Sequence, residues 1–254
     1  MNRFFSLIIL TLLTFLPAQS ELEKGMEWYN RRAEGSVGSM AKADPIGRAI
    51  DHLEKALSGT DGDKAALMLM KALYFKGEYT TSDEDEKKEI FDRGKRFAEK
   101  YVSHYPDSAP FRYWFLVNLG SWSKAYGIIT AAREGVADLM KEHSEKIIQL
   151  DPDYEHGGGY FMLGAVHYSS PYIPFLLSWP DNDEAIVWLQ KAVATGKPRL
   201  VQMIYLAQAL YEDGQEKEAI SILEKVKATR PAAETLVENR DDIREAKELL
   251  RKYR

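Results

Sequence analysis

The sequence predicts an all-α fold in which helical hairpins stack into one solenoid. Apolar residues recur at intervals of three and four along most of the chain, which is the spacing of one helix face. Two pairs, Leu163-Gly164 and Leu206-Ala207, stand near the start of a helical stretch, and a downstream alanine opens a second helix after each pair. No segment shows the alternating pattern between hairpin turns that a β-sheet requires.

The chain begins with a pattern typical of a secretory signal peptide. Arg3 precedes an apolar run over 4–16, and Ala18-Gln19-Ser20 provides small residues for cleavage after Ser20. The run is short for a membrane span, and the alternative interpretation is an uncleaved anchor. The sequence has no cysteine, which excludes disulfides and lipid attachment through an N-terminal cysteine. We expect residues 1–20 to be a signal peptide and the mature protein to be soluble in a bacterial periplasm.

Four segments in the first part of the chain carry a helical stripe of apolar residues. They span 46–57, 65–75, 90–101 and 131–150. The second and third form a pair that is joined by a polar loop. Prolines and acidic residues mark the starts and ends of these helices, because proline cannot continue a helix.

The unit over 160–192 has a long connection between its two helices. Leu163 and Gly164 belong to the first helix, and Ala185 and Leu189 belong to the second. The connection over 169–180 contains three prolines, which exclude a regular helix, yet it is strongly apolar. Because a solvated loop would be polar, this segment must pack on something. It either forms the wall of a pocket or covers the core beneath it.

The unit over 203–231 fits a 34-residue tetratricopeptide frame, in which helix-turn-helix units stack on their neighbours. Asp213-Gly214 forms the turn, since glycine readily takes a positive φ. The small residues let the two helices approach closely, and the larger residues fill the space between them. The residues that fit the frame are Leu206, Ala207, Leu210, Ala219, Leu223, Val226 and Pro231.

A last helix spans about 234–253. It is rich in charge and has apolar residues along one face, which suits a terminal cap with a solvated outer side. We therefore expect residues 21–254 to form a single solenoid of degenerate tetratricopeptide repeats with a C-terminal capping helix.

A stripe of aromatic residues with one amide forms the first candidate binding surface. Trp114, Asn118, Trp122 and Tyr126 follow each other at intervals of four, so they share one helix face. Such a stripe is most often core. The amide permits a second interpretation, since a buried amide needs hydrogen-bond partners. In a groove, it would bind a peptide backbone or a ligand carboxylate between two aromatic side chains.

The repeat frame places a second set of residues on the concave face. Ala165 and Ile204 are expected there, beside larger groups from the same helices and from the apolar connection. The further residues expected to bind a partner or ligand are Phe161, Tyr168, Tyr172, Trp179, Gln208 and Tyr211.

The sequence carries no pattern of catalytic or metal-binding residues. The five histidines are scattered, and none has a partner at metal-ligand spacing. No nucleophile elbow around a serine occurs. The net charge of −5 gives no electrostatic reason for a nucleic-acid partner. We expect a binding protein without enzymatic activity, cofactor or metal.

Three motifs in the middle of the chain point to a family. They are YWFLVNLG at 113–120, LDPDY at 150–154 and HGGGYFMLG at 156–164. Together they resemble the T component of tripartite ATP-independent periplasmic (TRAP) transporters, called TatT. The resemblance implies a periplasmic repeat protein that forms a trimer with a central pore and apolar clefts.

The same resemblance implies a partner. The proposed task of that family is to bind the transporter's solute-binding P component. The expected function is therefore that of a periplasmic adaptor in solute uptake. The alternative is a carrier of small hydrophobic ligands that are held in an apolar cleft.

Overall fold

The computed structural model describes residues 19–173 and 177–254, so most of the predicted signal peptide lies outside the described residues. No helix in the described part combines the length and the apolar character that a membrane-spanning helix needs. The described elements are α1 (Glu21–Asn30), α2 (Ala43–Ala56), α3 (Gly62–Tyr79), α4 (Glu84–His104), α5 (Ala109–Tyr126), α6 (Ile128–Arg133), α7 (Val136–Leu150), α8 (Gly158–Ser169), α9 (Asn182–Val193), α10 (Leu200–Glu212), α11 (Glu216–Ala228), a 3-10 helix (Ala233–Thr235) and α12 (Leu236–Lys252).

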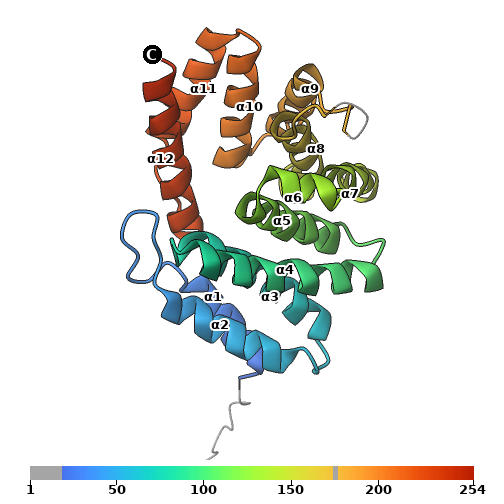
Figure 1. The fold of residues 1–254 in the computed structure, drawn as a ribbon. Helices are drawn as coiled ribbons and strands as arrows, with labels where there is room; N and C mark the ends of the chain where they lie inside the picture. Colours follow the sequence, from blue (N-terminus) through green and yellow to red (C-terminus); the bar gives the residue numbers. More distant parts are fainter. Residues whose placement is uncertain (1–18, 174–176) are drawn as a thin grey trace, which may run out of the picture.

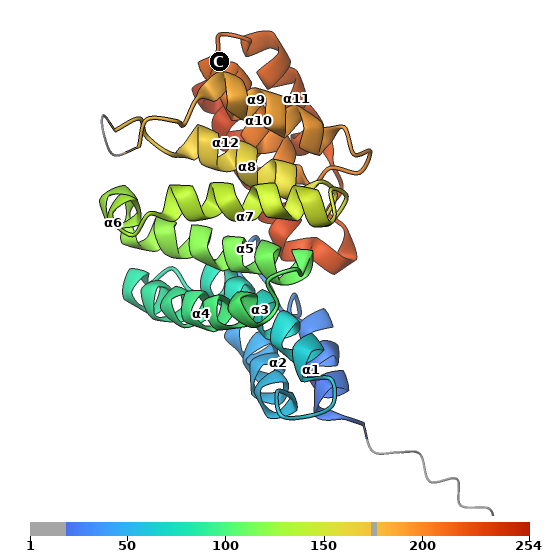
Figure 2. The same ribbon diagram turned by 90° about the vertical axis from the view of Figure 1, so that its right-hand side faces the viewer.

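The helices pair into hairpins that stack on one another (Figures 1 and 2). The pairs are α1 with α2, α3 with α4, α5 with α7, α8 with α9, and α10 with α11, and the short α6 lies between α5 and α7. The first helices of successive hairpins, from α3 through α5 and α8 to α10, also contact one another. The predicted all-α solenoid of helical hairpins is thus confirmed.

Small residues allow the closest contacts between helices, as the repeat frame requires. Ala207 in α10 and Ala219 in α11 are both fully buried. A Cβ atom placed on Gly164 of α8 would lie 2.6 Å from Cγ of Leu189 and 3.1 Å from the carbonyl oxygen of Ala185. The helices α8 and α9 therefore pack too closely for a side chain at position 164.

The single helix predicted over 131–150 is wrong. The structure has two helices there, because α6 ends at Arg133 and α7 begins at Val136. Gly135 precedes α7 with a φ of 67°, in the left-handed region that favours glycine. The apolar spacing continues across this break, so periodicity alone could not reveal it.

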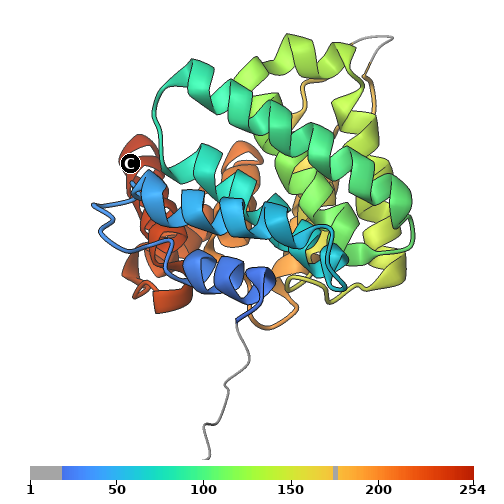
Figure 3. The same cartoon turned by 90° about the horizontal axis from the view of Figure 1, so that it is seen from below.

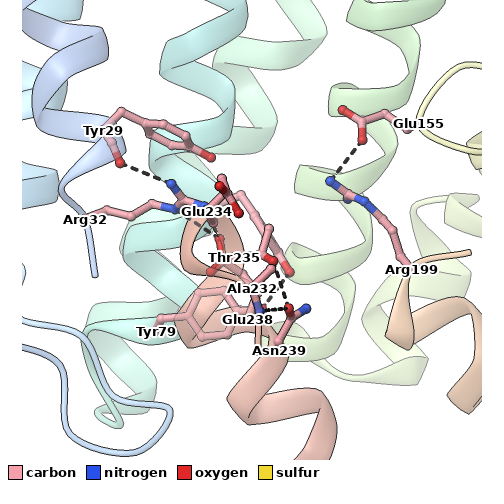
Figure 4. Close-up of polar contacts among 11 residues, drawn as sticks. Tyr29, Arg32, Tyr79, Glu155, Arg199, Ala232, Glu234, Thr235, Glu238 and Asn239 are labelled. Atoms are coloured by element: carbon pink, nitrogen blue, oxygen red, sulfur yellow. Dashed lines mark hydrogen bonds and ion pairs between the residues drawn. The ribbon is translucent and has the colours of Figure 1, made fainter. Parts of the chain in front are cut away.

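The C-terminal helix α12 packs on α10 and α11, as a cap would, and it also reaches the first hairpin (Figures 1 and 3). Val237 is fully buried among apolar residues of α2 and α3. Arg32, which follows α1, forms an ion pair with Glu238 at 2.7 Å and donates to the backbone carbonyl of Glu234 (Figure 4). The two ends of the solenoid are therefore joined by side-chain contacts.

Candidate binding cleft

A cleft of about 450 Å³ lies between the stacked first helices and α12; we call it the inner cleft. Residues of α3, α5, α6, α7, α8, α10 and α12 line it. Val117, Phe161, Ala165 and Val201 contribute apolar surface from three successive hairpins. This apolar surface depends on the stacking order, since no single hairpin provides it.

Charged and polar groups accompany the apolar surface. Glu78, Lys124 and Glu245 line the inner cleft together with Tyr205. The pKa of Lys124 is raised above its ordinary value because Tyr205, Glu78 and Glu245 lie near its ammonium group. The inner cleft can therefore hold an apolar group whose neighbours are polar or charged.

The helix α12 places an additional carboxyl group near this region. Burial, with the negative charges of Glu245 and Asp241 nearby, raises the pKa of Asp242 to about 7. Its surroundings thus favour the protonated form more than water does.

Four of the ten predicted binding residues line the inner cleft. They are Trp114 from α5, Phe161 and Tyr168 from α8, and Gln208 from α10. Trp114 and Phe161 are buried, whereas Tyr168 and Gln208 are partly exposed. The structure brings these four side chains together across three hairpins.

The rest of the aromatic stripe lies outside the inner cleft, and its placement in a groove is wrong for Asn118. Asn118 is fully buried, and its Nδ2 donates to the carbonyl oxygens of Met70 at 3.3 Å and Trp114 at 2.8 Å. It thus ties α5 to α3. Trp122 is also buried, and its ring stacks on that of Tyr126 with centroids 4.7 Å apart. These contacts are those of a core face.

The remaining predicted residues also lie away from the inner cleft. Tyr172 is 65% exposed on the connection between α8 and α9. Trp179 donates from Nε1 to the carboxylate of Asp138 at 2.8 Å. Tyr211 stacks on Tyr253 with ring centroids 3.5 Å apart, so it secures the end of α12. The repeat frame placed Tyr211 on the concave face beside Phe161, and this placement is wrong, since Tyr211 does not line the inner cleft. Tyr172 and Trp179 were expected to bind as part of the apolar connection, and neither lines the inner cleft.

The apolar connection between α8 and α9 serves both purposes that the sequence left open. Pro171 and Leu177 line the inner cleft. Leu177 is also buried in a small core with Ala137, Leu163 and Val166. The described ends of this connection thus wall the cleft and cover part of the core.

Several cleft residues were not identified from the sequence, and Tyr205 is the clearest example. The repeat frame places Ile204 on the inner face, but Ile204 is fully buried and Tyr205 lines the cleft instead. One step along a helix changes the side-chain direction by about 100°. The rotation of α10 about its axis therefore decides which of two neighbouring residues faces the cleft.

Within residues 19–173 and 177–254, no three His, Asp or Glu side chains gather where they could hold a metal ion. Glu155 and Arg199, which lie near the cleft, form an ion pair at 2.9 Å (Figure 4).

Comparison with known proteins relates the chain to one family and one fold. The family model described as "Regulator of microtubule dynamics protein 1-3" matches residues 42–176. No curated protein sequence matches the chain. The matched family model is not that of the TRAP T component, so that resemblance stays a prediction.

A solved structure gives the same architecture. The chain is similar to the crystal structure of a thermophilic TPR protein of Thermus thermophilus, with a TM-score of 0.57. The similarity covers 92% of this chain and 96% of that chain at 13% sequence identity. At this identity, the likeness establishes the TPR-type solenoid and nothing about ligands.

Proposed function

We propose that this chain, which belongs to the Regulator of microtubule dynamics protein 1-3 family, is a TPR-type adaptor that holds a segment of a partner protein in its inner cleft. The observation that carries the proposal is the cleft itself. Its apolar surface comes from three hairpins, and aromatic and charged side chains accompany it. Helical-repeat proteins use such extended inner surfaces for binding.

The composition of the inner cleft suits an anchor of a protein partner. Tyr168 and Tyr205, which are partly exposed, provide aromatic contact area, and Gln208 and Lys124 provide polar contacts. Aromatic groups dominate the binding energy of protein interfaces, and polar groups around them give orientation. An apolar side chain of the partner, flanked by its polar backbone, would match this arrangement.

The second candidate function is a carrier of small hydrophobic ligands. The volume of about 450 Å³ falls in the range of small-molecule sites. The helix α12 also faces the first helices across the cleft, which favours a compact ligand over a long chain. Lipid or another apolar molecule that co-purifies with the protein, detected by native mass spectrometry, would favour this candidate over the adaptor.

We further propose export to the periplasm and an interaction with the P component of a TRAP-type uptake system. The apolar N-terminal run supports export, and the motifs at 113–120, 150–154 and 156–164 support the transporter partner. The comparisons with known proteins give no information on export or on a TRAP-type partner. Both therefore depend on direct tests.

Export predicts that the mature protein begins at Glu21. N-terminal sequencing of the form recovered from the periplasm should read Glu-Leu-Glu from that residue. In the full chain, Ser20 caps α1 through a hydrogen bond from the amide of Glu23 at 3.2 Å, and cleavage after Ser20 removes this cap. A mature protein that keeps Met1 would contradict the export proposal.

The cleft predicts which side chains bind. Tyr168→Ala and Tyr205→Ala should each weaken capture of the P component by about 1–2 kcal/mol, roughly tenfold, because both rings line the inner cleft. Titration calorimetry with the purified P component measures this. Tyr172→Ala is the matched control, because its ring is 65% exposed and outside the cleft. If Tyr172→Ala alone weakens capture, the binding surface is the connection between α8 and α9.

A buried variant separates binding from folding in the same experiment. Asn118→Ala should lower the free energy of unfolding by about 1–3 kcal/mol, because it removes two buried hydrogen bonds and leaves a void. The folded fraction should bind as wild type does. Weaker binding by fully folded Asn118→Ala would restore the original groove interpretation.

A further inference from the structure

A second recess, of about 610 Å³, lies between α11 and α12 at the C-terminal end of the chain. Six basic side chains and one apolar side chain line it; we call it the basic groove. Its residues are Lys227, Arg240, Arg244, Lys247, Leu250, Arg251 and Arg254. The groove is distinct from the inner cleft, with which it shares no lining residue.

The helix α12 arranges four of these cations in a row. Arg240, Arg244, Lys247 and Arg251 are separated by four, three and four residues, so they share one helix face. At 1.5 Å of rise per residue, the row is about 16 Å long. Around the axis of α12, Glu245 lies roughly 130° from the middle of this row. One helix therefore presents acidic surface to the inner cleft and basic surface to the groove.

Carboxylates of the protein neutralise only part of this charge. Lys227 and Arg254 share Glu224, and Arg244 pairs with Asp241 at 2.7 Å and with Glu248 at 3.0 Å.

The other three cations of the row have no such partner. Arg240 donates only to the Ser36 hydroxyl at 3.3 Å and to the Gly38 carbonyl at 3.4 Å. Across residues 19–173 and 177–254, no carboxylate lies within 4.0 Å of the basic group of Arg240, Lys247 or Arg251. Their charges stay available to a ligand.

The cluster of cations in the basic groove contrasts with the negative net charge of the chain. The whole chain has a net charge of −5, so the groove is opposite in sign to the rest of the protein. A local positive field in a recess attracts an anionic partner and guides its approach.

We infer that the basic groove binds an acidic segment of a partner protein. Four of its six cations are arginines, and the planar guanidinium group binds carboxylates through two parallel hydrogen bonds. In an extended peptide, side chains on one face recur about every 6.6 Å. The Cβ atoms of residues three and four apart on a helix are separated by about 5–6 Å, which is close to that recurrence.

Two other classes of anion fit the groove less well. Binding of single-stranded nucleic acid depends on aromatic side chains that stack on bases, and no aromatic residue lines the groove. Insertion into a bilayer interface depends on exposed apolar anchors, whereas Leu250, the one apolar residue there, is 3% exposed. A recess between two helices also suits a chain better than a flat surface.

The test uses the full protein and a synthetic peptide. The probe is a fluorescein-labelled peptide of about eight residues with Glu at alternate positions, which spans the groove when extended. Fluorescence anisotropy should show binding at about 50 mM salt, and affinity should fall steeply towards about 500 mM. A peptide with Gln in place of each Glu should not bind.

Two variants and a matched control locate the interaction. Lys247→Glu/Arg251→Glu should raise the Kd for the acidic peptide by about tenfold or more, and Lys247→Gln/Arg251→Gln should raise it less. Lys100→Glu/Lys197→Glu makes the same change in net charge at exposed sites that do not line the groove, and it should leave the Kd nearly unchanged. Thermal melts confirm that each variant is folded.

Several outcomes would overturn the inference. One is that the wild-type protein does not bind the acidic peptide. Another is that the control variant loses affinity as much as the groove variant, which would assign binding to overall charge. Equal or tighter binding of a single-stranded oligonucleotide, or of phosphatidylserine vesicles, would show that the partner class is wrong. The inference does not depend on the inner cleft, so Tyr168→Ala should bind the peptide as wild type does.

Discussion

Gly164→Ala should lower the free energy of unfolding by about 2–3 kcal/mol, although alanine usually stabilises a helix relative to glycine. The reason is the contact between α8 and α9. The added Cβ would lie 2.6 Å from Cγ of Leu189, 3.0 Å from the backbone nitrogen of Leu189 and 3.1 Å from the carbonyl oxygen of Ala185. Two of these three atoms belong to backbone, so the helices themselves would have to separate.

Gly47→Ala is the matched control for Gly164→Ala. Gly47 lies inside α2, and a Cβ atom there would meet no other atom within 4 Å. This variant should therefore stabilise the protein by about 0.5–1 kcal/mol, through the lower conformational entropy of the unfolded chain. Urea unfolding of both variants measures the two shifts. If Gly164→Ala stabilised the protein as Gly47→Ala does, α8 and α9 would be less closely packed than the structure indicates.

Arg32→Met should destabilise the protein by about 2–4 kcal/mol, since it breaks a largely buried ion pair between the two ends of the solenoid. The side chain of Arg32 is 8% exposed and that of Glu238 is 20% exposed. Removal of the guanidinium group leaves the Glu238 carboxylate without its cation and the Glu234 carbonyl without its donor. The methionine keeps much of the apolar contact with Tyr29 and Phe75, whose rings lie beside the arginine.

The neighbouring residue provides the control for Arg32→Met. Arg31 forms an exposed ion pair with Glu34 at 2.7 Å, and Arg31→Met should change the free energy of unfolding by less than about 1 kcal/mol. Chemical denaturation of both variants, together with Glu238→Leu and the double variant, gives the coupling energy between Arg32 and Glu238. Equal effects of the Arg31 and Arg32 variants would mean that the contact between the chain ends adds nothing to stability.

Local sequence patterns predicted the repeat architecture well. Leu206, Ala207 and Ala219 occupy helix contacts because the size of a residue at a fixed repeat position decides how closely two helices approach. The same reasoning located Gly164 against α9. These contacts join helices of one hairpin, which are only a few tens of residues apart, so local spacing in the sequence predicts them.

The details of the candidate site could not be predicted in the same way. The choice between Ile204 and Tyr205 depends on the rotation of α10, which its neighbours in the stack determine. Asn118 looked like a polar group in a groove, but α3 supplies the Met70 carbonyl that it binds. The sequence predicted that α12 caps the end of the solenoid. It did not predict the contact of α12 with the first hairpin, because Arg32 and Glu238 are 206 residues apart in the chain.

That separation has a consequence for the kinetics of folding. In an open array of repeats each unit contacts only its neighbours, so structure can begin at any hairpin and spread along the chain. The contact between Arg32 and Glu238 closes a loop that contains nearly the whole described chain, and it can form only after the intervening hairpins have assembled. We therefore expect this contact to be absent from the folding transition state. Loss of Arg32 should then accelerate unfolding while the folding rate stays close to that of the wild type.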